Sequence, residues 1–150
     1  MLLMSKVQML ERQFADRGVH IIGIQEGRAK ASHERMGTEY KMLTAAADPK
    51  GDFGVQLWVL HGITVLAWRA VSPRLLYAVT SHKGAEQGWL VGHAPIEHAK
   101  TKDKDAWWDL LEDTYQASCT KFKVPWSCLL DANAKVGVMS PSAPRPRRAG

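Results

Sequence analysis

The stretch GVQLWVLHGITVLAWRAVSPRLLYAVTSHKGAEQGWLVGHAP, residues 54–95, decides the fold. It contains four short apolar runs separated by turn-forming residues, which is the pattern of neighbouring β-strands. His61-Gly62 lies between the first two runs and Lys83-Gly84 between the last two, so the sequence predicts a hairpin at each place. We therefore expect the middle of the chain to form an antiparallel meander of several strands.

A predicted helix lies on either side of this stretch. The first, over residues 2–17, places its apolar residues on one face: Leu3, Val7, Leu10 and Phe14. Gly18 then follows, where a helix C-terminal glycine belongs. The second helix is expected over residues 102–118, with Asp103 or Asp105 as its N-cap.

Shorter segments complete the order of elements. VHIIGIQE (19–26) and PWSCLLDAN (125–133) have the composition of buried strands that end on polar residues, and residues 40–47 form a further candidate strand. Residues 27–39 are polar and expected to be a loop, and 48–54 to be a turn. The order predicts an α+β fold in which helices cover one face of the sheet. Little of the chain remains to cover the other face.

Composition and charge set bounds on the kind of protein. The chain has 150 residues, of which 45% are hydrophobic and 23% charged, as in one globular domain. The formal charge is +5, but three arginines and no acid lie in the last ten residues, which leaves 5 − 3 = +2 for the rest. Charge alone therefore identifies no partner. The Pro/Arg-rich tail, residues 138–150, is expected to be disordered, which leaves 1–137 as the domain.

The two cysteines and the apolar runs bear on the compartment. Cys119 and Cys128 form no CxxC pair, which argues against a zinc site. Two reduced thiols in an intracellular protein are the better interpretation, and one disulfide remains open. No secretory leader and no apolar run of about 20 residues is present, so we expect a cytoplasmic or nuclear protein and no membrane partner.

Polar residues follow three of the predicted strands. Glu26 ends the first, His93 the second, and Asp131 with Asn133 the third. Asp131 and Asn133 are two residues apart, so in an extended segment their side chains point to the same side. Their oxygen atoms, with those of Glu26, are ligands that suit a hard cation such as Mg²⁺. Taken singly, Glu26 could equally be a solvated strand end, His93 a structural histidine and the last pair an Asx turn. The set of three strand ends favours a site.

Three segments also resemble one known family, in the family's order. IIGIQEGR resembles the endonuclease/exonuclease/phosphatase superfamily strand that presents a metal-binding Glu after a Gln. VGHAPIE is similar to the strand end that carries a catalytic His in the deoxyribonuclease-like branch. CLLDANAKVG resembles the strand ending in Gly-Asp-Phe-Asn-Ala, with Leu130 and Ala132 in place of Gly and Phe. The resemblance spans about residues 10–137. The combination of the three motifs is also similar to the endonuclease-like domains of retroelements.

The resemblance implies a role for each residue. Glu26 would bind Mg²⁺ or Mn²⁺, and His93 would contact the scissile phosphate and help with proton transfer. Asp131 would orient the attacking water, and Asn133 would hold a phosphate oxygen. Arg28 would contact a nucleic-acid backbone, although a solvated arginine is an equal alternative. Arg74 also follows a turn, at Ser72-Pro73, where a surface position is the better interpretation than a phosphate contact.

The family fold is a four-layer α/β/β/α sandwich with mostly antiparallel sheets, of which the chain is expected to supply about half. After Asn133 the sequence has no Asp, Glu or His, so the family's later catalytic motifs have no counterpart. We therefore expect little or no activity from the chain alone. An uncovered sheet face, with Trp58, Trp68 and Trp89 as candidates for it, would lead to self-association.

These observations leave three hypotheses about function. The first is a metal-dependent phosphodiester hydrolase, or a piece of one, that acts on DNA or another phosphodiester. The second is a non-catalytic module that binds a partner or nucleic acid through the open sheet and the basic tail. The third is a small-molecule or lipid phosphatase of the same superfamily.

Overall fold

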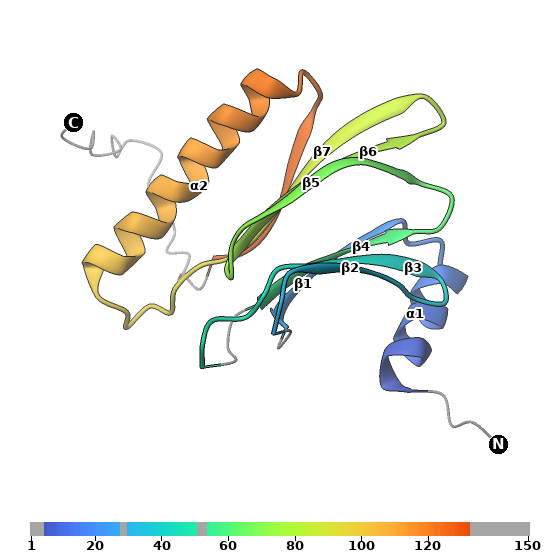
Figure 1. Cartoon of the computed structure of the whole chain (residues 1–150), viewed down its shortest axis with the longest axis horizontal. Coiled ribbons are helices and arrows are strands. Elements are labelled where there is room, and N and C mark those ends of the chain that lie inside the picture. Colours follow the sequence, from blue (N-terminus) through green and yellow to red (C-terminus); the bar gives the residue numbers. More distant parts are fainter. Residues whose placement is uncertain (1–4, 28–29, 51–53, 133–150) are drawn as a thin grey trace, which may run out of the picture.

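The computed structural model describes residues 5–27, 30–50 and 54–132, without the side chains of Glu26 and Gly27. In this part of the chain two four-stranded sheets pack face to face, and one helix lies against the outer side of each (Figure 1). The layers follow the order helix, sheet, sheet, helix. The prediction of an α+β sandwich with mostly antiparallel sheets is therefore confirmed.

The first sheet, sheet A, has the strand order β1-β4-β3-β2, and every neighbouring pair is antiparallel. Its strands are β1 (Ile21–Gly27), β2 (His33–Met36), β3 (Tyr40–Thr44) and β4 (Gly54–Leu60). The helix α1 (Lys6–Asp16) precedes it and begins with a capping box, in which Ser5 and Gln8 each accept from the other's backbone N–H. Gly18, at φ 71°, follows its C-terminal end as predicted.

The second sheet, sheet B, has the strand order β5-β6-β7-β8. Its strands are β5 (Thr64–Ser72), β6 (Leu75–His82), β7 (Ala85–His93) and β8 (Trp126–Asp131). The last pair, β7 and β8, is parallel, and the helix α2 (Thr101–Lys121) makes the connection between them. A parallel pair needs such a crossover, because its two strands must start at the same end of the sheet.

One of the two predicted hairpins is wrong. β4 and β5 flank His61-Gly62 but belong to different sheets, because β4 already pairs on both sides, with β1 and β3. The turn instead carries the chain from sheet A to sheet B. The hairpin at Lys83-Gly84 is confirmed: both residues have positive φ, 50° and 80°, as a two-residue type I′ turn requires.

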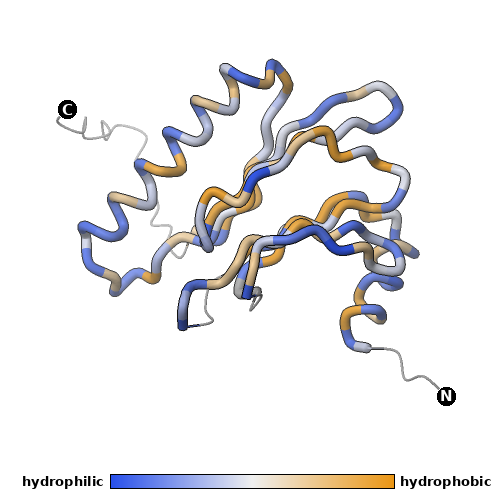
Figure 2. Tube along the Cα trace, viewed as in Figure 1, coloured by the Kyte–Doolittle hydropathy of each residue, from blue (hydrophilic) through white to orange (hydrophobic). Residues whose placement is uncertain are grey.

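The core fills the space between the two sheets, so neither sheet has the uncovered inner face that we expected. Its buried residues come from both sheets: Leu43, Ala45, Val55, Leu57, Val59, Leu76, Ala78 and Val91. Figure 2 shows the hydrophobic positions gathered along these strands. Trp68 and Trp89 pack against this core, whereas Trp58, only 4% exposed, belongs to a second cluster beneath α1. None of the three tryptophans lies on an uncovered sheet face.

Two smaller predictions were also wrong. The expected loop over residues 27–39 contains the strand β2, whose charged side chains are all exposed because it is an edge strand. The N-cap of α2 is Lys100, without a side-chain hydrogen bond, and Asp103 lies within the first turn. Both cysteines have free thiols, and no helix among the described residues is long and apolar enough to cross a membrane.

Candidate active site at the strand ends

The parallel pairing of β7 and β8 brings two of the predicted site residues together. His93 and Asp131 are the last residues of their strands and lie opposite each other in the register. The His93 Nε2 atom is 3.9 Å from the Asp131 Oδ2 atom. The backbone continues the contact, since the Ala94 N–H donates to the Asp131 carbonyl over 2.8 Å. Residues 38 positions apart in the chain therefore form one group of side chains.

The two members of this pair differ in their exposure. The side chain of His93 is 3% exposed and that of Asp131 is 49% exposed. A separation of 3.9 Å is longer than a hydrogen bond, so the pair is an ionic contact that forms when the histidine is protonated. A buried imidazole beside a carboxylate that faces solvent is an arrangement that can hold a proton next to an incoming substrate.

Arg74 holds the end of β7 in place. Its guanidinium group donates to the carbonyl oxygens of His93 and Ala94, over 3.3 and 3.2 Å. Its own carbonyl accepts from the His93 N–H over 2.9 Å. The pKa of Arg74 lies below its ordinary value because the group is partly buried, and the nearby carboxylate of Asp48 offsets part of this effect. The sequence predicted a surface position for Arg74. The contacts to these carbonyls were missed because a Ser-Pro-Arg turn does not indicate which carbonyls the side chain will meet.

The third strand end, that of β1, lies on the same side of the sandwich. Figure 1 shows β1, β7 and β8 all ending at the left of the view. β1 approaches sheet B closely at Gly23, where a Cβ atom would lie 3.0 Å from the Leu129 Cβ atom. Its register is irregular between Ile24 and Gly27, a segment that contains Glu26. The bulge changes the direction of the strand at its end.

Three of the predicted site residues are not tested by this geometry. The side chain of Glu26 is not described, and Arg28 and Asn133 lie outside the described residues. Among the described side chains no group of three or more His, Cys, Asp or Glu could hold a metal ion. The binding of Mg²⁺ or Mn²⁺ therefore stays a prediction, as do the roles of these residues.

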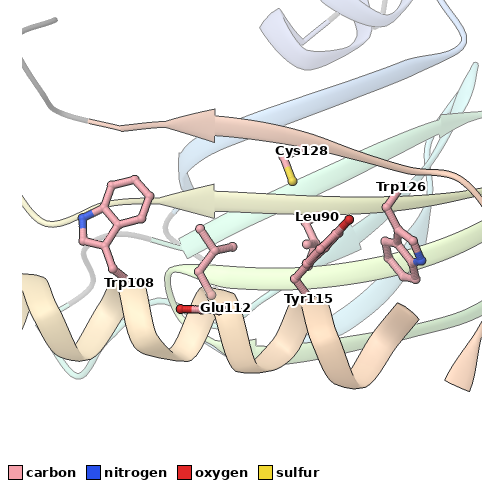
Figure 3. A pocket seen from close by; sticks show the side chains of 7 residues that line it. Leu90, Trp108, Glu112, Tyr115, Trp126 and Cys128 are labelled. Carbon is pink, nitrogen blue, oxygen red and sulfur yellow. The ribbon is translucent and has the colours of Figure 1, made fainter. Parts of the chain in front are cut away.

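A second feature, which the sequence did not indicate, lies between α2 and sheet B. It is a groove of about 460 Å³, seen from close by in Figure 3, and its lining is mostly apolar: Leu90, Trp108, Leu111, Glu112, Tyr115, Trp126 and Cys128. Burial raises the pKa of the Cys128 thiol, and the neighbouring Cys119 adds to this effect.

Comparisons with known proteins bear on the fold. No protein-family model matches the chain, and no curated protein sequence matches it. Two crystal structures of TDP2 from Caenorhabditis elegans, one in its selenomethionine form, are similar, each with a TM-score of 0.60 and 12% identity. The similarity covers 85% of this chain but 42% of the TDP2 chain, so the chain spans less than half of that protein's length.

An identity of 12% supports a shared fold and says nothing about individual residues. The chain therefore has the deoxyribonuclease-I-like sandwich fold that TDP2 also has.

Proposed function

We propose that the chain is a metal-dependent phosphodiester hydrolase domain of the endonuclease type, with weak or no activity by itself. The observation that carries the proposal is the meeting of His93 and Asp131 at the parallel ends of β7 and β8. The fold shared with TDP2, a member of a superfamily of phosphodiesterases, supports it.

In this proposal each residue has a separate task. His93, held in place through Arg74, contacts the scissile phosphate and transfers a proton to or from an oxygen. Asp131, half exposed beside it, orients the attacking water. Asn133 holds a phosphate oxygen, and Arg28 contacts the backbone of a nucleic acid.

Glu26 is the proposed ligand of a divalent cation. A glutamate at the end of β1, on the side of the sandwich where Asp131 ends β8, offers the carboxylate oxygens that Mg²⁺ and Mn²⁺ prefer. When bound, the ion polarises a phosphate oxygen and stabilises the charge that develops on it. Because this chain would supply few ligands, the ion would be weakly bound, and this is one reason to expect weak activity.

The test is the nicking of supercoiled plasmid by the full chain in Mg²⁺ and in Mn²⁺. We expect slow nicking that falls to the background in Glu26→Ala and in His93→Ala. Glu86→Ala is the matched control, because Glu86 is an exposed acid at the opposite end of β7. Calorimetric titration with Mn²⁺ supplies a second measurement, in which only Glu26→Ala should lose binding.

Two outcomes would separate this proposal from its alternatives. If Mn²⁺ binds equally well to the protein and to Glu26→Ala, and neither variant changes nicking, the hydrolase assignment is wrong. Hydrolysis of bis(p-nitrophenyl) phosphate without nicking of plasmid would shift the substrate class to small phosphate esters. Salt-sensitive DNA binding that depends on the tail arginines alone would instead indicate the binding module.

A further inference from the structure

β8 is an edge strand of sheet B, and it differs from the other edges of the sandwich. It pairs with β7 over six residues without any irregularity, and it has no strand on its other side among the described residues. Its sequence is WSCLLD, in which Asp131, the last residue, is the single charge. Open edges of this kind pair readily with another strand.

The other three edges all carry a feature that blocks pairing. β5, at the opposite edge of the same sheet, has two irregularities in its register and the charged Arg69. In sheet A, β2 is four residues long and exposes charged side chains, and β1 is bulged near Glu26. Bulges, short strands and charges are the means by which natural proteins protect their edges. β8 has none of them before its last residue.

The direction of the backbone groups of β8 can be worked out from its pairing. The carbonyls of Pro125 and Asp131 accept from the Gly88 and Ala94 N–H groups of the β7 side. Alternate residues of a strand direct their backbone groups to opposite sides. The odd-numbered residues therefore bond to β7, and the even-numbered residues face outward: Trp126, Cys128 and Leu130. No partner of these outward groups is found among the described residues.

The charges around β8 indicate what would pair with it. Lys121 and Lys123 precede the strand, and Asp131 ends it. A second copy in antiparallel orientation would place Asp131 beside Lys123 of the other chain, once at each end of the joined strands. A parallel arrangement would place like charges together, which destabilises a strand pair. The edge is therefore complementary to itself in one orientation.

We propose that two copies of this chain associate through antiparallel pairing of their β8 strands. The apolar groove between α2 and sheet B adjoins this edge, since Trp126 and Cys128 belong to both. Pairing would extend sheet B across the two copies and bring the two grooves close to the two-fold axis. The association requires no metal, but it shares Asp131 with the proposed active site.

Hydrogen exchange measured by NMR on the full chain tests the backbone pairing directly. The amides of Ser127 and Leu129 bond to β7 and should be protected at every protein concentration. Those of Cys128 and Leu130 should exchange quickly in dilute protein and become protected as the concentration rises. Sedimentation velocity over the same range should show the mass moving from 16.7 kDa toward twice that value.

A substitution at the exposed Cys128 tests the same contact, because proline removes its outward N–H and leaves the bonds to β7 in place. Cys128→Pro should sediment as a monomer, and Cys128→Ser, the matched control, should associate like the unchanged protein. If the proline variant does not fold, charge variants replace it. Lys123→Glu should raise the dissociation constant of the dimer about threefold for each of the two Lys123–Asp131 contacts. Lys123→Glu combined with Asp131→Lys should restore the association.

Three results would overturn the proposal. The first is a monomer at every concentration, which would also leave the edge open to a different partner. The second is a dimer whose Cys128 and Leu130 amides stay unprotected. The third is a folded Cys128→Pro protein that associates as strongly as Cys128→Ser.

Discussion

The two outer faces of the sandwich are covered by one helix each, but the helices are attached differently. On sheet A, the side chain of Glu11 is 1% exposed and accepts from the backbone N–H groups of Glu39 and Tyr40, each over 3.1 Å. Val7 and Phe14 of the same helix pack against a cluster in which Tyr40 and Trp58 are buried. α1 is therefore fixed by a buried carboxylate and an apolar cluster together.

On sheet B, α2 buries Trp107, Thr114 and Ser118, so it packs in its middle as well as nearer its ends. Trp107 is buried near its start, where it lies over Gly92. Phe122, just after its end, contacts the rings of Tyr77 and Trp126, with centroids 6.2 and 6.5 Å away. Beside this buried face of α2 the groove of about 460 Å³ remains open.

The difference reflects how each helix enters the fold. α1 precedes sheet A and no strand pairing depends on its connection, so only side-chain contacts hold it in place. α2 is the crossover that makes β7 and β8 parallel, so both of its ends are fixed by the strands it joins. A helix held in this way need not bury every apolar side chain, and Leu111 and Tyr115 line a groove instead.

The largest expected effect comes from tryptophan substitutions on the two faces. Trp58→Ala, beneath α1, removes a side chain that is 4% exposed and should lower the free energy of unfolding by about 3–5 kcal/mol. Trp108→Ala removes a half-buried groove residue and should cost less than about 1.5 kcal/mol. Urea unfolding measures both, and equal costs would contradict the difference between the faces.

The next effect concerns the carboxylate that fixes α1. Glu11→Ala leaves the buried N–H of Tyr40 and the partly buried N–H of Glu39 without their acceptor and should cost about 3 kcal/mol. Glu11→Gln keeps an acceptor oxygen and should cost less. Glu112→Ala, the same change in α2 at the groove, should stay within about 0.5 kcal/mol. A costly Glu112→Ala in the same denaturation series would show that the groove side of α2 also contributes to stability.

The smallest effect lies where the two sheets meet. Glu34 of β2 accepts from the Trp68 indole N–H of β5, and Lys41 lies 3.2 Å from its carboxylate. The indole hydrogen bond, followed by Lys41, lowers the pKa of Glu34 below its ordinary value of 4.5. A lowered pKa stabilises the folded state above the ordinary value, and this stability is lost as pH falls through the lowered one.

The side chain of Glu34 is 44% exposed, so we expect less than about 1 kcal/mol from this link. The free energy of unfolding, followed by urea titration from neutral pH into the acid range, should fall less steeply in Glu34→Gln than in the unchanged protein. Parallel curves for the two proteins would mean that the contact between Glu34 and Trp68 contributes nothing measurable.

Much of the fold could be predicted from local patterns. The apolar runs of the strands, the glycine after α1 and the Lys83-Gly84 turn all depend on neighbouring residues, and all were found where the sequence placed them. The strand β2 was missed because three of its four residues are polar and all four are exposed, as an edge strand allows. The hairpin at His61-Gly62 failed because a turn residue does not specify which sheet the next strand will join.

By itself, the sequence determined the order of the elements apart from β2, the α+β class and the placement of His93 and Asp131 at strand ends. Only the tertiary structure decided that β4 and β5 lie in separate sheets that bury each other's inner faces, that Arg74 holds the end of β7, and that β8 is an open edge. The physical reason is the range of the interactions. Periodicity and turns act over a few residues, whereas strand partners and buried contacts join residues far apart in the chain.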